Sequence, residues 1–195
     1  DISKSPKEVT RQVVYSMLRG GAGICFLCRQ HDFRLHLVDV GVDHDFGDEP
    51  QLMHRKLRHG TRSYLREAAM TEEEATKALE IGERCVDEAL ERGCRLLSFG
   101  EMGITNTSSS ALWMYYLTDL PLEACVGRGS GLDDEGMQRK LAVLRTAVER
   151  YSGTGDAWSV LCYFGGYELV ATVGAMLRAA ERRTPFLVDG FIMTA

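Results

Sequence analysis

One local pattern recurs along this chain: a short apolar strand, then a glycine-bearing loop, then a helix. It occurs at residues 98–100 before a helix at about 106–117, and at residues 124–127 before a helix at about 133–150. It returns at residues 187–190, close to the last residue of the sequence. Strands that alternate with helices of this length predict right-handed crossovers and a parallel sheet. We therefore expect an α/β fold of three layers, a doubly wound and mainly parallel sheet with helices on both faces.

The length of 195 residues suits one large hydrophobic core rather than two. Hydrophobic residues make up 45% and charged residues 26%, which is typical of a globular protein. We expect residues 1–195 to form a single α/β nucleotide-binding domain. Because the sequence starts without Met and stops inside a strand–helix unit, we also expect further segments at both ends of the full protein.

Charge and hydropathy exclude several classes of partner. The net charge is −5 and no block of Lys or Arg is present, so we expect no nucleic acid partner. No run of about 18 apolar residues and no secretory pattern occurs, so we expect no membrane contact and a cytoplasmic protein. The six cysteines stand mostly among apolar residues, which favours free thiols. Cys25 and Cys28 followed by His31 supply only half of a zinc site, and we predict no metal and no cofactor.

Local signals define the remaining elements. Residues 5–8 and 71–74 both read as capping boxes that open helices. Residues 35–40 alternate as a strand, and residues 42–62 are polar and predict a long loop. Further helices are expected at about residues 24–31, 156–163 and 167–182.

The glycine-bearing loops should together form one binding site. Ligands of parallel α/β sheets bind beyond the carboxyl ends of the strands. The loops at residues 99–108, 126–132 and 188–190 all follow expected strands, and glycine permits a close backbone approach to a ligand. We predict that these loops meet on one rim.

The first loop carries the most chemistry. Glu101 stands before Gly103, and its carboxylate would accept hydrogen bonds from ribose hydroxyls or from a protonated base. Asn106 is the expected N-cap of the next helix, and Thr107 and Ser108 add hydroxyl groups where free amides would hold a phosphate. The alternatives are an exposed loop carboxylate and a solvated helix cap.

The second loop contains Gly127, Arg128 and Gly129, which resemble a dinucleotide-binding fingerprint. The fingerprint requires a final glycine where this chain has Leu132, so a Rossmann-type oxidoreductase is a weak alternative. Lys140 on the following helix would reach back to a phosphate, unless it lies on a solvated helix face.

Two further pairs complete the predicted substrate-binding set. Gly165 and Gly166 precede an apolar helix whose start would face the ligand, with close helix packing as the alternative. Asp189 and Gly190 end the last expected strand on the same rim.

Taken in order, these motifs resemble the nicotinate-nucleotide:dimethylbenzimidazole phosphoribosyltransferase family. The resemblance is carried by residues 100–107, 126–133, 165–168 and 187–192 and by the stretch 6–42. It implies a pentosyltransferase that moves the ribose phosphate of nicotinate mononucleotide to 5,6-dimethylbenzimidazole or a related azole. The product would be α-ribazole phosphate, which supplies the lower ligand of cobalamin.

The resemblance also implies residue roles and an assembly. Glu101, the neighbouring glycine loop and Lys140 would help hold the mononucleotide, and the protein would be a homodimer. The general base of the family would lie beyond Ala195, which leaves Glu101 an orienting role. Thr105 stands where the family usually has Gly. These two departures leave open a catalytically inactive homologue that binds a mononucleotide.

Overall fold

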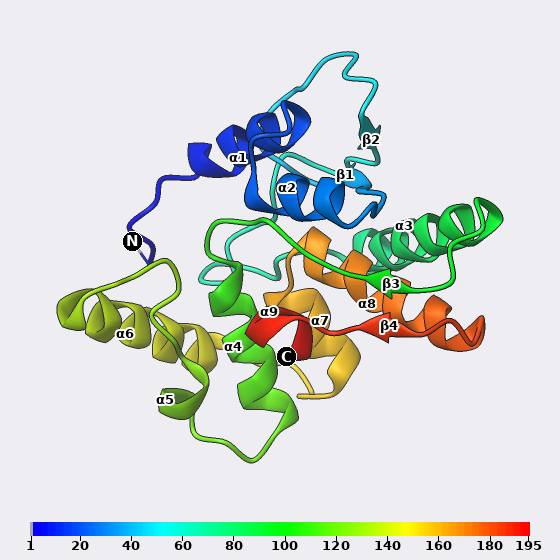
Figure 1. Cartoon of the computed structure of the whole chain (residues 1–195). Coiled ribbons are helices and arrows are strands. Elements are labelled where there is room, and N and C mark those ends of the chain that lie inside the picture. Colours follow the sequence, from blue (N-terminus) through cyan, green and yellow to red (C-terminus); the bar gives the residue numbers. More distant parts are fainter. Residues whose placement is uncertain (1) are drawn as a thin grey trace.

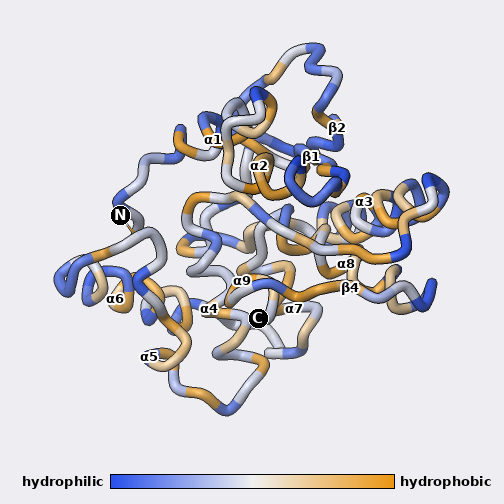
Figure 2. Tube along the Cα trace, in the orientation of Figure 1, coloured by the Kyte–Doolittle hydropathy of each residue, from blue (hydrophilic) through white to orange (hydrophobic). Residues whose placement is uncertain are grey.

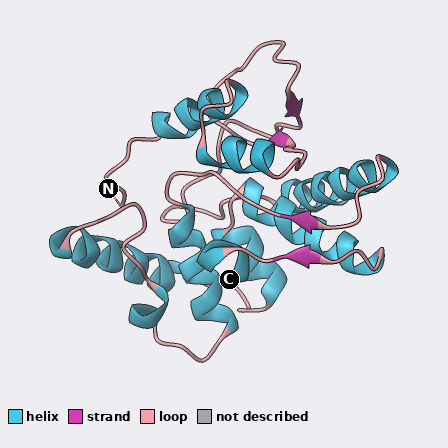
Figure 3. Cartoon of the chain, in the orientation of Figure 1, coloured by secondary structure: helices cyan, strands magenta, loops and turns pink. Residues whose placement is uncertain are grey.

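The computed structural model describes residues 2–195, and helices dominate it (Figures 1 and 3). The helices are α1 (Glu8–Leu18), α2 (Gly23–Gln30), α3 (Glu72–Glu91), α4 (Asn106–Leu117), α5 (Leu122–Cys125), α6 (Asp134–Arg150), α7 (Ala157–Phe164), α8 (Tyr167–Glu181) and α9 (Gly190–Thr194). The strands are β1 (Leu37–Asp39), β2 (Leu52–His54), β3 (Leu97–Ser98) and β4 (Phe186–Leu187).

The strands pair in parallel, as expected for alternating strands and helices. β1 pairs with β2, and β3 pairs with β4, with Leu97 opposite Phe186. The described residues thus form a mixed α/β fold with two separate two-stranded sheets. The single doubly wound sheet of the predicted three-layer fold is not formed by these residues alone.

Two local predictions are wrong for identifiable reasons. The sequence predicts a strand at residues 124–127, but Pro121 precedes the helical turn α5, and the amide of Val126 donates to the carbonyl of Leu122 (3.1 Å). The fixed φ of proline suits the start of a helix, which overrides the apolar run after it. The segment 42–62, predicted as a loop, contains strand β2. This strand has no strong strand pattern in its own sequence and forms by pairing with β1.

Of the two predicted capping boxes, one is confirmed. The hydroxyl of Thr71 accepts from the amide of Glu74 (3.1 Å), and the Glu74 carboxylate accepts from the amide of Thr71 (2.8 Å). At α1 the box is absent, because the amide of Ser5 donates to the side chain of Ser3 and Lys7 occupies the cap position without a side-chain bond. Serine hydroxyls often make such competing local bonds.

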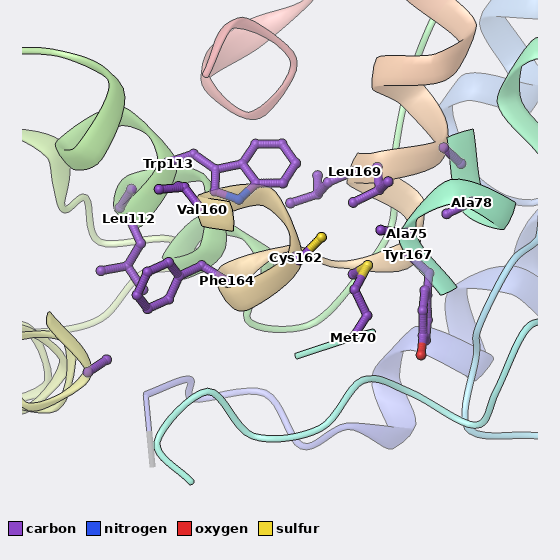
Figure 4. Packing of buried hydrophobic residues seen from close by; sticks show 14 of the residues in the cluster. Met70, Ala75, Ala78, Leu112, Trp113, Val160, Cys162, Phe164, Tyr167 and Leu169 are labelled. Atoms are coloured by element: carbon purple, nitrogen blue, oxygen red, sulfur yellow. The ribbon is translucent and has the colours of Figure 1, made fainter. Parts of the chain in front are cut away.

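The largest core cluster joins α3, α4, α7 and α8. Leu112 on α4 and Phe164 on α7 are fully buried, and Figure 4 shows them packed together beside Trp113. Met70, before α3, is also buried, and its amide donates to the carbonyl of Cys162 (3.1 Å). Apolar colour accordingly gathers on the central helices in Figure 2, whereas the outer side of α6 is polar. This packing fixes α8 and the first turn of α4, and the first turn of α4 lies at the candidate site.

Helices α3 and α8 cross at unusually short range, side by side in Figure 1. A Cβ atom on Gly82 would lie 1.7 Å from the carbonyl oxygen of Ala171, and one on Gly174 would lie 2.2 Å from that of Leu79. Close packing on a neighbour, the alternative given for the apolar helix after Gly166, is therefore confirmed for α8.

Across residues 2–195, no helix is both long enough and apolar enough to cross a membrane.

Glu74 anchors the irregular segment before α3. Its carboxylate accepts two hydrogen bonds from Arg62 (2.6 and 3.2 Å) and lies 3.3 Å from Arg58. The hydrogen bonds from Arg62 are the main reason that the pKa of Glu74 falls to about 2. The pair is largely buried, with the Glu74 side chain 18% exposed.

We predict that Gly174→Ala lowers the free energy of unfolding by about 1–3 kcal/mol, because the new methyl group collides with helix backbone that cannot move alone. Urea unfolding measures the change. Gly23→Ala is the matched control, since its Cβ meets no atom within 4 Å, and it should be neutral or stabilising. Equal effects at both positions would contradict the close crossing.

We also predict an acid-sensitive contribution from Glu74. Its pKa in the folded chain, about 2, lies below the ordinary 4.5, so its stabilisation is present above pH 4.5 and is lost as the pH falls toward 2. The contribution is on the order of 1–3 kcal/mol after allowance for partial exposure. Urea midpoints at about pH 6 and about pH 3 should differ less for Glu74→Gln than for the unchanged chain. An unchanged pH dependence in the variant would refute the assignment.

Candidate functional site

A cavity of about 410 Å³ opens where the three glycine-bearing loops meet, which confirms the predicted convergence. It is lined by Glu101, Thr107, Gly127, Gly129, Asp189, Gly190, Phe191 and Ile192. The geometry follows from β3 and β4, whose parallel pairing brings their carboxyl ends, and the loops after them, to one edge. Figure 1 shows α9, which starts at Gly190, beside α4.

A second cavity of about 100 Å³ adjoins the first and shares Thr107 and Gly129 with it. Ile2 and Ser3 close it from the amino-terminal side, and Gly103, Asn106 and residues 128–130 are among the others that line it. Thr107, in the first turn of α4, thus borders both cavities.

Two carboxylates face the larger cavity. Glu101, on the loop between β3 and α4, is half-buried, and burial raises its pKa. Its Oε2 accepts a hydrogen bond from Nδ2 of Asn106, which lowers the pKa by a smaller amount. Asp189, exposed after β4, lines the same cavity. The alternative that Glu101 is a freely exposed loop residue is therefore wrong.

The start of α4 differs from the prediction. Thr105 and not Asn106 is the cap residue, and it makes no side-chain cap bond. Thr105 has φ 84°, a left-handed conformation that costs a β-branched residue about 1–2 kcal/mol and that glycine adopts freely. A glycine at this position would relieve the strain. The amide of Ile104 donates to the hydroxyl of Thr10 on α1 (3.2 Å), which supports the loop from the opposite side.

Lys140 is the buried cation of the site. Its residue is 1% exposed, and Nζ donates to Oγ1 of Thr107 (3.1 Å) and to the carbonyl of Gly127 (2.9 Å). Among residues 2–195 no carboxylate lies within ion-pairing distance of it, and burial lowers its pKa. A buried ammonium without a counter-charge is costly, so an anion at this position would be stabilising. The alternative of a solvated helix face is wrong for Lys140.

Several predicted site residues face elsewhere. Ser108 is fully buried within α4 and lines neither cavity. Gly165 packs in the core, where a Cβ would lie 3.1 Å from the ring of Trp113. Gly166 is the cap residue of α8 and contacts the carboxylate of Glu168 instead of a cavity.

Arg128 lines the smaller cavity, but its guanidinium braces its own loop. It donates to the carbonyl of Leu132 (2.9 Å) and pairs with Asp134 (2.5 Å), and its side chain is 57% exposed. Gly129 next to it has φ 54°, so the loop turns sharply beside Lys140.

Sequence reasoning missed the apolar part of the site. Phe191 and Ile192 line the larger cavity from α9, and Ile2 lines the smaller one. Phe191 and Ile192 directly follow an expected strand end, which is the one local signal that marks them. Within residues 2–195, no group of three His, Cys, Asp or Glu side chains is placed to hold a metal ion.

Comparison with known proteins defines the class. A family model described as phosphoribosyltransferase matches residues 1–195. The chain therefore belongs to this phosphoribosyltransferase family.

Individual relatives carry a more specific name. The nicotinate-nucleotide–dimethylbenzimidazole phosphoribosyltransferase of Parabacteroides distasonis is 58% identical over 194 residues, covering 99% of this chain and 56% of the relative. The protein of the same name from Bacteroides fragilis is 52% identical over 193 residues, with the same two coverages. The crystal structure of CobT from Thermus thermophilus is similar with a TM-score of 0.91 and 40% identity, over 99% of this chain and 58% of that one. The chain thus spans a little over half the length of these relatives.

We predict that Lys140→Met leaves the melting temperature of the ligand-free chain unchanged or raises it, because an unpaired buried ammonium is replaced by an apolar chain of similar length. Added inorganic phosphate should raise the melting temperature of the unchanged chain by mass action and should not raise that of the variant. Thermal unfolding with and without phosphate measures both effects. Equal stabilisation of the two proteins by phosphate would contradict an anion site at Lys140.

Proposed function

We propose that this protein transfers the phosphoribosyl group of nicotinate mononucleotide to 5,6-dimethylbenzimidazole or a related azole, giving α-ribazole phosphate. The observation that carries the proposal is the charge arrangement around the larger cavity. The carboxylates of Glu101 and Asp189 line it, and the buried ammonium of Lys140 lies directly behind two other lining residues, Thr107 and Gly127. A phosphoribosyl group has the complementary polarity, with an anionic phosphate at one end and an electron-poor anomeric carbon at the other. The names of the relatives support the choice of substrates.

The phosphate would lie beside Lys140, Thr107 and Gly129. The ammonium contacts the hydroxyl of Thr107 and lies 3.7 Å from the position that a Cβ on Gly129 would occupy. The positive φ of Gly129 and the absence of a side chain there let a phosphate approach the backbone. Charge-assisted hydrogen bonds of this kind are roughly twice as strong as neutral ones.

The transfer would occur at the other end of the group. An unprotonated azole nitrogen forms a bond to the anomeric carbon while the bond from that carbon to the nicotinate nitrogen breaks, and the azole then loses its remaining N–H proton to a base. Positive charge grows on the sugar in the transition state, and the carboxylates of Glu101 and Asp189 would stabilise it. Catalysis consists mostly of orientation, which suits a cavity built from fixed loops. We place the general base outside residues 1–195.

We further propose a larger assembly around this unit. Parallel sheets are normally covered on both faces, and Leu96, Leu187 and Val188 beside β3 and β4 are exposed, which supports one larger doubly wound sheet in the longer protein. Phe26 and Leu27 on α2 are more than half exposed, which supports a homodimer. The six free cysteines favour the cytoplasm, where thiols stay reduced.

The test is turnover by the whole protein. Incubation with nicotinate mononucleotide and 5,6-dimethylbenzimidazole should release nicotinate, which chromatography detects. Glu101→Ala should weaken nucleotide binding or turnover about tenfold or more while the melting temperature stays within a few degrees, since the side chain lines a cavity rather than the core.

Four outcomes would redirect the assignment. No release of nicotinate with any of several azole or phenol acceptors would reject the transfer reaction. Tight mononucleotide binding without turnover would favour an inactive homologue. Binding of a nicotinamide dinucleotide with hydride transfer would favour the oxidoreductase. A large loss of stability in Glu101→Ala would mean that Glu101 is structural.

A further inference from the structure

The side-chain amide of Asn106 bridges two carboxylates that come from different parts of the chain. Nδ2 donates to Oε2 of Glu101 on the loop before α4 and to Oε1 of Glu168 on α8 (3.3 Å). Asn106 is 7% exposed, so the amide is held away from solvent. Glu168 is 62 residues farther along the chain, and it lines neither of the two cavities.

The carboxylate of Glu168 lies against two glycines, Gly103 and Gly166, and there is no room for a side chain at either position. A Cβ on Gly103 would lie 2.4 Å from Oε1 of Glu168, and a Cβ on Gly166 would lie 2.8 Å from its Oε2. The carboxylate therefore reaches from the first turn of α8 to the backbone of the loop that carries Glu101. Side chains at either glycine position would displace it.

The two carboxylates determine how Asn106 is oriented. An asparagine side chain has a donating end and an accepting end, and only the NH₂ end can face two carboxylates without repulsion. Without Glu168, the amide would have one acceptor instead of two, and rotation would take its hydrogen away from Glu101. Burial raises the pKa of Glu168, and the negative charge of Glu101 raises it further.

We propose that Glu168 is a positioning residue of the site, which fixes the carboxylate of Glu101 at the cavity through the side-chain amide of Asn106. This inference rests on the proposed function, because it assigns Glu101 to the ribosyl end of a bound mononucleotide. It also gives a reason for the glycines at positions 103 and 166, which lie against the carboxylate of Glu168, although Gly103 lines the smaller cavity as well.

A conservative pair of variants separates positioning from mere helix stabilisation. Glu168→Gln keeps a carbonyl oxygen that can accept from Asn106, whereas Glu168→Leu removes every acceptor at similar size. Both remove a negative charge from the first turn of α8, so a pure helix-dipole role predicts equal effects. Glu73→Leu in the first turn of α3 is the control for loss of an acidic residue at a helix start away from the site.

The first measurement needs no ligand. The side-chain NH₂ signals of Asn106, identified with Asn106→Asp in ¹⁵N-edited NMR spectra, report its two hydrogen bonds directly. We expect one of the two proton signals to move upfield in Glu168→Leu and to stay near its original position in Glu168→Gln and Glu73→Leu. Unchanged signals in Glu168→Leu would overturn the proposal, even if the melting temperature fell.

The second measurement is the affinity for nicotinate mononucleotide by calorimetry in a double-mutant cycle. Glu168→Leu should weaken binding about tenfold and Glu168→Gln less than about threefold, because only the Gln variant keeps an acceptor for the amide of Asn106. In the Glu101→Ala background, Glu168→Leu should cause no further loss. Equal losses in both backgrounds would overturn the proposal. If the unchanged chain and the whole protein both fail to bind the nucleotide, the proposed function fails, and the NMR result alone decides the role of Glu168.

Discussion

The buried ammonium of Lys140 is the interaction on which the site depends. It donates to Thr107 at the start of α4 and to the carbonyl of Gly127, and so it lies between the first turn of α4 and the loop before α6. A cation in this position is unfavourable on its own, because burial lowers its pKa and the described residues offer it no carboxylate. The loops therefore meet at a point of unsatisfied positive charge. A bound phosphate would supply the missing negative charge. In the proposed complex, part of the binding free energy therefore comes from relieving the unfavourable burial of the Lys140 ammonium.

The rest of the molecule keeps that point rigid. The crossing of α3 and α8 at Gly82 and Gly174 fixes the start of α8, and with it Glu168. The core around Leu112 and Phe164 fixes α4 in the same frame. The first turns of two helices and the ends of two parallel strands are thus positioned by contacts distant from the cavity. Such support is what a transfer reaction driven by orientation requires.

Local chemistry could be predicted from the sequence, and long-range contacts could not. The capping box at Thr71 and the extents of α4 and α6 follow from patterns within a few residues, and all are present. The convergence of the glycine loops is also present, but the rule for parallel strand ends accounts only for the loops after β3 and β4. The strand expected at residues 124–127 failed because Pro121 starts a helical turn there. The burial of Lys140, the bond from Ile104 to Thr10 and the reach of Glu168 to Gly103 join residues far apart in sequence, and no local pattern encodes them. Arg128, whose motif suggested a ligand contact, instead binds the carbonyl of Leu132 in its own loop and the carboxylate of Asp134 at the start of α6.

The most direct test is a crystal structure of the chain with nicotinate mononucleotide bound. The account predicts that a phosphate oxygen lies within hydrogen-bonding distance of Nζ of Lys140 and near the backbone of Gly129, with the ribose against the carboxylate of Glu101. A nucleotide bound elsewhere, or one whose phosphate avoids Lys140, would contradict it.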